Sequence, residues 1–289
     1  MNDWENLRVL LAVLESGSLG GAAQRLSVSP ATVGRRLTAL DDELGTVVVE
    51  RGPGGVRITE AGQAMLAALR DAERALTRAR QLASNRDVGG LVRVASLRST
   101  AADLICPHLP DFYASHPDIQ IQLMVSHEVV NLGRGDADIA IRSLRPTQQN
   151  LVMKQLPTPP IVPMIAASIL RRHGNGSVDV RDLPWVAWPE DANIMEVRWF
   201  QQHVPKAQIV LRVDDLHAQA RACQAGVGAT LLPASLRGIY SGIRIIPGAP
   251  EGFTLPLWLV SPEAVRSLPR VAAVWSFIDG LFDRLFRHQ

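Results

Sequence analysis

Two adjacent arginines and several hydroxyl groups stand near the start of an expected helix in SVSPATVGRRLTALDDELG, residues 27–45. Ser29 followed by Pro30 is typical of a helix N-cap and first turn, because proline loses no hydrogen bond there. Arginine presents a planar fork of donors that fits phosphate oxygens and the edge of guanine. The segment therefore carries groups suited to nucleic-acid binding. We expect such contacts from Ser18, Ser29, Pro30, Thr32, Gly34, Arg35, Arg36 and Arg57.

An apolar stripe should bury the opposite side of this helix. Its members recur every three or four residues, the period of a helix that packs one face against a core. They are Val33, Leu37, Leu40 and Leu44. This stripe turns Thr32, Gly34 and the two arginines outward or to the flanks.

Two shorter helices are expected before it. Apolar residues in WENLRVLLAVLESGSL follow the same helical period. Ser18 is suited to cap a second helix, GGAAQRL, through its side-chain oxygen. Three helices joined by short turns form a helix-turn-helix, which inserts its last helix into the major groove of DNA.

A β-hairpin, or wing, is expected directly after the three helices. Residues 47–49 and 56–58 are short β-prone runs on either side of a Gly/Pro turn, and Arg57 lies at the edge. A wing with cations would bind the DNA backbone. The alternative for the whole segment is a three-helix bundle with a solvated arginine face and a surface hairpin.

A long helix is expected over residues 60–87, which contain no proline. Apolar residues recur there at alternating spacings of four and three, which suits pairing with a second copy of the same helix. This seam consists of Met65, Leu69, Ala72, Leu76 and Ala79. The alternative is that the helix packs on its own domain. A dimer would double the DNA contacts that one recognition helix can make.

The pattern changes at about residue 88 to alternating strands and helices. Expected strands at 91–96 and 118–126 enclose a helix at 100–116, and a further strand precedes Arg142. This βαβαβ order indicates a parallel sheet flanked by helices. Two α/β lobes of this kind would hold a ligand at the ends of their strands.

The order and spacing of NLRVLLAVLESGSLGGAAQRLSVSPATVGRRLTALDDELG and ITEAG resemble the winged helix-turn-helix of LysR-type transcriptional regulators. The phrases GRGDADIAIR and QAGVGATLLP are similar to the effector domain of that family. The resemblance implies an α/β chain with an N-terminal all-α winged helix-turn-helix. It also implies a two-lobed C-terminal effector domain with the type 2 fold of periplasmic binding proteins.

The resemblance sets the expected domain boundaries. The DNA-binding domain is residues 1–59, the linker helix is 60–87 and the effector domain is 88–289. Lobe 1 is expected at about 88–160 plus 264–289, and lobe 2 at about 161–263.

Three segments match the effector-site walls of that family. Their candidate residues are Ser96, Arg98, Ser99, Thr100, Arg142 and Asp214. Hydroxyls and free amides at a helix start favour an anion, and an arginine favours a carboxylate. Each has an alternative: Ser99 and Asp214 could simply cap helices, and Arg142 could pair with Asp138.

Several other classes of protein are disfavoured. A nucleophile elbow, a phosphate-binding loop, a dinucleotide fingerprint and a metal-ligand cluster are all missing, so an enzyme is not expected. The N-terminal helices and the lack of a leader peptide argue against a plain solute-binding protein. Cys106 and Cys223 are expected to be small buried residues.

These observations predict a sequence-specific transcriptional regulator whose activity is modulated by a small effector. No cofactor, metal or catalytic residue is expected. The expected partners are double-stranded DNA, a second copy of the chain through the linker helix and, by the resemblance, a tetramer, with RNA polymerase as a further candidate. Membrane contact is not expected, and the expected location is the cytoplasm.

Overall fold

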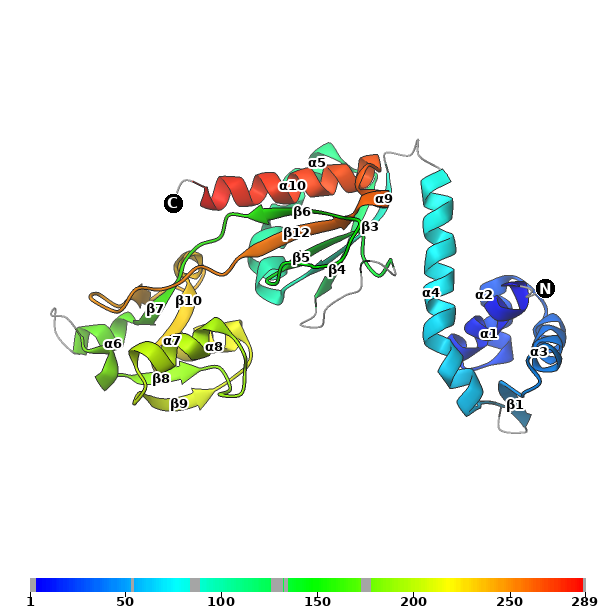
Figure 1. Ribbon diagram of the computed structural model, residues 1–289, viewed down its shortest axis with the longest axis horizontal. Coiled ribbons are helices and arrows are strands. Elements are labelled where there is room, and N and C mark those ends of the chain that lie inside the picture. Colours follow the sequence, from blue (N-terminus) through cyan, green and yellow to red (C-terminus); the bar gives the residue numbers. More distant parts are fainter. Residues whose placement is uncertain are drawn as a thin grey trace. The chain divides into compact units, whose positions relative to one another are not determined.

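The computed structural model (Figure 1) describes residues 4–52, 55–83, 89–125, 132, 135–172 and 178–287. These residues form two compact units, which are described separately. The first is built mainly from residues 1–86 and the second from the remainder of the chain.

The first unit is a winged helix-turn-helix with a long helix attached. Its elements are α1 (Trp4–Ser16), α2 (Leu19–Leu26), α3 (Pro30–Leu44), β1 (Val49–Gly52), β2 (Gly55–Ile58) and α4 (Glu60–Ala83). Leucine, valine and alanine side chains of α1, α2 and α3 make one core, which the start of α4 completes. The expected order of three helices, hairpin and long helix is therefore correct.

Side-chain caps begin α2 and α3 as predicted. The Gly21 amide donates to Ser18 Oγ at 3.0 Å, and the Thr32 amide donates to Ser29 Oγ at 3.1 Å. Between α2 and α3, Ser27 has a φ of 55° in the left-handed region, which ends α2 within a single residue. These local contacts set where α3 begins.

One expectation about α3 is wrong. Leu44 is 41% exposed, because the chain turns at Gly45 and the core is filled instead by Val48 and Val49. Gly34 is buried. It carries no side chain, and the Thr38 hydroxyl covers its carbonyl by donating to it at 3.2 Å.

The wing and α4 are joined by close backbone packing. β1 pairs with β2 in an antiparallel hairpin that places Arg57 opposite Glu50, and the tip at 53–54 lies outside the described residues. The Thr59 hydroxyl donates to the Val48 carbonyl at 3.0 Å. A Cβ on Gly62 would lie 2.3 Å from that same carbonyl oxygen, so this position of α4 accommodates only glycine without a shift.

Lobe 1 of the second unit contains one five-stranded sheet in the order β4-β3-β5-β12-β6. Its strands are β3 (Gly90–Ser96), β4 (Ile119–Val125), β5 (Ile139–Arg142), β6 (Leu151–Leu156) and β12 (Leu257–Pro262). β3 is parallel to β4 and β5, as the βαβαβ order predicts, whereas β12 is antiparallel to β5 and β6. Figure 1 shows α10 (Pro269–Phe286) lying along this sheet, and α9 (Glu263–Arg266) precedes it.

The boundary expected between the lobes at residue 263 is wrong. β12 belongs to lobe 1, because it pairs with two strands of that sheet and buries Leu259 in the lobe 1 core. The chain returns from lobe 2 at about residues 254–256, where the Thr158 hydroxyl on the outgoing segment donates to the Leu255 carbonyl at 2.9 Å. Below, lobe 1 means the described residues of 90–132, 137–156 and 257–286, and lobe 2 means the described residues of 161–253.

The single helix expected at 100–116 is broken. A helical turn at Arg98 and Ser99 continues as a π-helix, η1 (Thr100–Ile105), then a 3₁₀ turn, η2 (Cys106–His108), then α5 (Leu109–Ser115). Pro107 and Pro110 lack the amide hydrogens that a continuous α-helix requires. π-helical turns of this kind are frequent at functional sites.

Lobe 2 contains two small sheets. β7 (Ile161–Ala166) lies between β10 (Thr230–Pro233) and β11 (Ile243–Ile245), both antiparallel to it, and β8 (Pro184–Ala187) is parallel to β9 (Gln208–Arg212). Its helices are α6 (Ala167–Arg172), η4 (Val180–Asp182), α7 (Met195–His203), α8 (Leu216–Gln224) and η5 (Ala234–Gly238). Trp185 is fully buried, and its ring contacts Trp199 and Phe200.

The two cysteines differ in exposure, which corrects the expectation that both are buried. Cys106 is exposed, whereas Cys223 is buried, and burial raises the pKa of its thiol to about 12. Because the thiolate is the reactive form, a thiol-specific reagent is expected to modify Cys106 rapidly and Cys223 only after denaturation. Mass spectrometry of the labelled native protein checks this. Equal labelling of both cysteines would contradict it.

Among the described residues, no helix is both long and apolar enough to cross a membrane, and no cluster of metal-ligating side chains is found.

Candidate functional site

The outer face of α3 carries a shallow groove. Its lining residues are Leu19, Pro30, Ala31, Gly34, Arg35, Thr38, Ala39 and Asp42. Arg35 is exposed in this groove and makes no ion pair among the described residues. Alanines lie one turn before and one turn after it, so its guanidinium can reach out past short neighbours.

Arg36 has a different environment from Arg35. Its Nη1 lies 3.3 Å from Glu5 Oε2, so the side chain is tied to α1. The pair is partly exposed, which makes it weak and open to competition from a phosphate. The two adjacent arginines therefore differ: Arg35 makes no ion pair within the described residues, whereas Arg36 is paired with Glu5.

The remaining predicted DNA contacts lie on the surface of the first unit. Ser18 and Ser29 use their Oγ atoms as cap acceptors, which leaves each hydroxyl hydrogen for another acceptor. The Thr32 and Ser29 hydroxyls lie 2.9 Å apart. Arg57 Nε donates to Glu50 Oε2 at 3.0 Å on the exposed wing. Pro30, in the first turn of α3, lines the groove.

The predicted dimer seam on α4 is only partly available. Leu69 is 5% exposed, and Met65 is partly buried beside it, because both pack against the helices of their own unit. Ala72 is half-buried, whereas Leu76 is 41% exposed and Ala79 is exposed. The self-packing alternative is therefore right for the first half of α4. Leu76 and Ala79 remain as seam residues.

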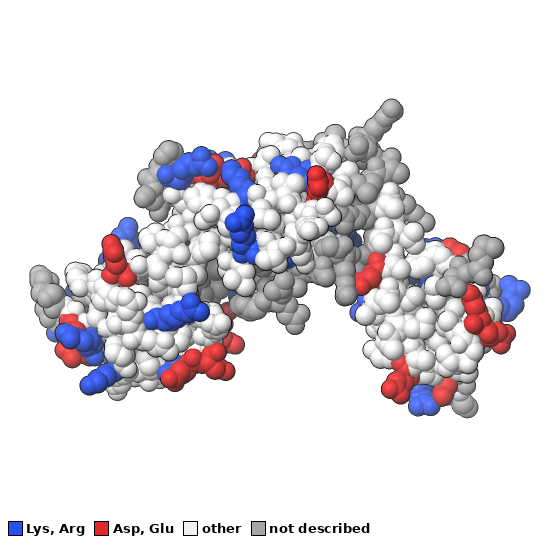
Figure 2. All heavy atoms as spheres, viewed as in Figure 1, with Lys and Arg blue, Asp and Glu red and all other residues white. Residues whose placement is uncertain are grey.

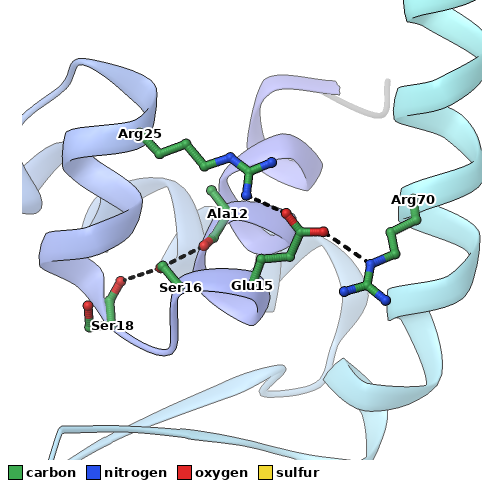
Figure 3. Close-up of polar contacts among 6 residues, drawn as sticks. All are labelled: Ala12, Glu15, Ser16, Ser18, Arg25 and Arg70. Atoms are coloured by element: carbon green, nitrogen blue, oxygen red, sulfur yellow. Dashed lines mark hydrogen bonds and ion pairs between the residues drawn. The ribbon is translucent and has the colours of Figure 1, made fainter. Parts of the chain in front are cut away.

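Glu15 joins three helices at one point (Figure 3). It stands near the end of α1 and accepts from Arg25 of α2 and, at 3.0 Å, from Arg70 Nε of α4. Burial alone would raise the pKa of Glu15, but the hydrogen bonds from Arg70 and Arg25 outweigh it and lower the pKa. The carboxylate therefore links the helix-turn-helix to the long helix in its charged form.

Glu15→Gln is expected to destabilise the first unit by about 1 kcal/mol, because two partly exposed arginines lose a shared charged acceptor. A lowered pKa contributes stability above the ordinary value of 4.5, and that stability is lost as the pH falls through the lowered pKa. The two proteins should therefore differ at about pH 7, and the difference should shrink as the pH falls below 4.5 through the lowered pKa. Hydrogen exchange of α1 amides measures this, with the exposed Glu43→Gln as control. A difference that stays constant with pH would contradict it.

The lobe 1 residues predicted for an effector lie where β3 ends and the next helical turn begins. Ser96 and Thr100 are buried, and the Ser96 hydroxyl donates to the Leu97 carbonyl at 3.3 Å. Ser99 makes no cap hydrogen bond, since it already lies inside the helical turn, so its capping alternative is wrong. Arg98 Nε lies 3.3 Å from Asp215 Oδ2 and so connects lobe 1 to lobe 2.

The other two effector candidates are Arg142 and Asp214. Arg142 is the last residue of β5 and half-buried, and burial lowers the pKa of its guanidinium. Asp214 is exposed, and the N-cap of α8 is its neighbour Asp215, whose Oδ1 accepts from the Ala218 amide at 2.8 Å. The expectation that Asp214 caps this helix is therefore wrong by one residue.

Sequence reasoning missed a second contact between the lobes. Asp103 of η1 faces His217 of α8, and His217 is bonded to Tyr240 beyond η5. These residues are far apart in the chain, and none belongs to a recognisable motif. Their positions in the chain were the one signal that could have pointed to this contact. Asp103 lies three residues after the predicted Thr100, and His217 lies just after Asp214 and Asp215.

The charge of the surface is mixed. On the face shown in Figure 2, acidic and basic side chains are interspersed over both units. The net charge of +2 agrees with this. Any attraction to DNA must therefore come from a local set of cations such as those on α3 and the wing.

Comparison with protein families matches almost the whole chain. Residues 4–63 match the bacterial regulatory helix-turn-helix protein, lysR family, and residues 85–282 match the LysR substrate binding domain. The Mau operon transcriptional activator of Paracoccus denitrificans is 29% identical over 288 residues, covering 97% of this chain and 96% of that protein. The activator IlvY of Salmonella typhimurium is 23% identical, covering 96% and 99%.

Solved structures support the same fold. Full-length CbnR in complex with its target DNA has a TM-score of 0.65 at 22% identity and covers 96% of this chain and 99% of its own. ArgP from Mycobacterium tuberculosis has a TM-score of 0.65 at 20% identity, covering 100% of this chain and 100% of its own. The relatives are regulators and not enzymes, as expected. The chain belongs to the LysR family of transcriptional regulators, with a DNA-binding helix-turn-helix and an effector-binding domain.

Proposed function

We propose that this regulator reads a two-fold related operator by placing α3 of each protomer in the major groove, with Arg35 as the principal base contact. The observation that carries this proposal is that Arg35 is exposed and has no ion pair within the described part of the chain, whereas Arg36 is tied to Glu5. Arginine contacts guanine through two parallel hydrogen bonds, the commonest specific contact in the major groove. Ser18, Ser29 and Arg57 are proposed to contact phosphates, which position the protein on the duplex.

Two copies of the chain are proposed to pair through the second half of α4. Leu76 and Ala79 are exposed there, while Leu69 is already used within its own unit. A dimer places its recognition helices about one turn of DNA apart, or a multiple of it. Assembly into a tetramer and contact with RNA polymerase in the cytoplasm are further parts of the proposal, and the family resemblance supports them.

A small effector is proposed to bind between the lobes and to shift their relative position, with no resident cofactor. The support is that one predicted wall residue, Arg98, already contacts lobe 2 through Asp215, the chain neighbour of the predicted Asp214. Allosteric coupling of about 1 to 3 kcal/mol changes affinity severalfold, which is enough to change transcription.

The test is a footprint of the purified full-length protein on the DNA immediately upstream of its own gene. The expected result is a protected, two-fold related site that weakens steeply with salt. That site then serves to screen small anionic metabolites for a change in affinity or footprint length. No protection at low salt, on this DNA or on a pool of random duplexes, would overturn the proposal.

A further inference from the structure

Asp103, His217 and Tyr240 form a largely buried chain of polar groups between the two lobes. Asp103 belongs to lobe 1, and the other two belong to lobe 2. The Asp103 side chain is 11% exposed and that of His217 is 23% exposed. His217 Nδ1 lies 2.6 Å from the Tyr240 hydroxyl, and His217 Nε2 lies 3.7 Å from Asp103 Oδ2. Since Tyr240 is itself buried, the imidazole is held from one side and faces the carboxylate on the other.

The two facing atoms are without hydrogen bonds. Asp103 Oδ2 and His217 Nε2 are both inaccessible to solvent, and neither has a hydrogen-bond partner among the described residues. Buried polar atoms are almost always paired, because an unpaired one has lost its water without replacement. The distance of 3.7 Å is too long for a hydrogen bond but short enough for an ion pair. The pair becomes an ion pair of opposite charges when the imidazole carries a proton on both ring nitrogens, whereas a neutral imidazole offers at most the weaker attraction of one N–H.

Other charges around the cluster are already engaged. Arg221 lies over the Tyr240 ring at 5.0 Å from its centre, and Asp215 is paired with Arg98. Burial raises the pKa of Asp103, and the nearby His217 opposes that rise, while burial and then Asp103 raise the pKa of Tyr240. The charge on His217 is therefore the variable that decides whether the Asp103 carboxylate is compensated.

We propose that Asp103 and His217 form a proton-dependent latch between the lobes, with Tyr240 orienting the imidazole. When the His217 imidazole is protonated on both nitrogens, it forms an ion pair with the Asp103 carboxylate and holds lobe 1 against lobe 2. When that proton leaves, the ion pair is lost, and among these residues only the Arg98–Asp215 contact remains as an ion pair. The latch regulates the proposed effector response, so in this respect it rests on the proposed function.

The direction with pH follows from the chemistry of the pair. Histidine is the side chain that commonly changes charge between about pH 5 and 8. A lower pH favours the imidazolium form of a histidine, so the proposed latch holds the lobes more firmly on the acidic side. Raising the pH loosens them.

Hydrogen–deuterium exchange of the full-length protein tests this without DNA or effector. Peptides covering residues 98–105 and 214–224 are followed at about pH 6 and about pH 8, with exchange corrected for the intrinsic effect of pH. We expect corrected exchange to be about fivefold slower at the acidic pH, as for a partly buried ion pair of about 1 kcal/mol. His217→Gln and Asp103→Asn should each remove this difference.

The matched control is His203→Gln in the same lobe. His203 lies on α7 and packs against Trp199 with tilted rings whose centres are 5.0 Å apart, and Trp199 belongs to the core of lobe 2. This variant should keep the full pH difference. If His217→Gln fails to fold, Asp103→Asn carries the same test, and the wild-type protein alone must show the pH difference.

Two results would overturn the latch. One is equal corrected protection of the wild-type peptides at both pH values, and the other is a pH difference that survives in Asp103→Asn or His217→Gln. A failure of the proposed function can be distinguished from a failure of the latch. The DNA footprint would then be missing, while the pH dependence of hydrogen exchange would still be observed.

Discussion

Arg35→Ala is expected to weaken binding to the specific operator by about 10- to 100-fold, while binding to unrelated DNA changes little. A bidentate arginine–guanine contact contributes about 1–3 kcal/mol of discrimination against a wrong base. Arg35 is exposed in the α3 groove, and no other cation among the described residues lines that groove to replace it. The loss should therefore appear as lost specificity and not as a uniform loss of affinity.

Titration of labelled operator and scrambled duplex at several salt concentrations measures both effects. If Arg35 contacts a phosphate instead, affinity falls on both duplexes and the salt slope shrinks by about one contact. Arg36→Ala should have a smaller effect, because Arg36 must first leave Glu5. Arg171→Ala on α6, an exposed arginine of lobe 2, controls for the loss of one charge. If the Arg35→Ala protein keeps the affinity, the specificity and the salt dependence of the wild-type protein, Arg35 does not contact the DNA.

Gly62→Ala is expected to destabilise the first unit by about 2 kcal/mol. The added Cβ would lie 2.3 Å from the Val48 carbonyl oxygen, and backbone cannot rotate away as a flexible side chain can. Overpacking of this kind costs roughly 1–3 kcal/mol, which exceeds the gain of about 1 kcal/mol or less from placing alanine in a helix. α4 must tilt away from the wing, so the spacing between paired recognition helices should change as well.

Exchange of the buried α1 amides, residues 9–14, reports opening of the first unit alone and avoids a two-state assumption for the whole chain. Gly20→Ala is the matched control, because no described atom lies within 4 Å of its added Cβ in α2. That control should leave protection unchanged or slightly raised. If the α1 amides are protected from exchange equally in Gly62→Ala and in the control, α4 accommodates the added Cβ without loss of stability, which would contradict the prediction.

Local elements of this protein could be predicted from sequence because their signals are local. Ser18 and Ser29 cap the helices that follow them through contacts within three residues, and Pro30 sits in the first turn where it loses nothing. Strands β3, β4 and β5 of lobe 1 could be predicted for the same reason, since runs of β-prone residues bounded by turns form strands in most contexts.

Tertiary packing decided which face each residue presents. Leu44 follows the helical period of a buried stripe, but the chain turns at Gly45 and Val48 occupies the core instead. Leu69 fits a dimer seam equally well by spacing, yet the core of its own unit already covers it. The helical period identifies a residue that is expected to be buried against apolar side chains. It does not identify which element of the protein, or which second copy, supplies those side chains.

The pairing of distant charges depended wholly on the fold. The sequence by itself determined a winged helix-turn-helix, a long helix and a two-lobed α/β domain, because those follow from period, caps and strand order. The tertiary structure alone decided that Arg36 meets Glu5, that β12 completes the sheet of lobe 1, and that Asp103 faces His217. The reason is that contacts between distant segments depend on how whole elements dock, and no spacing along the chain records that docking.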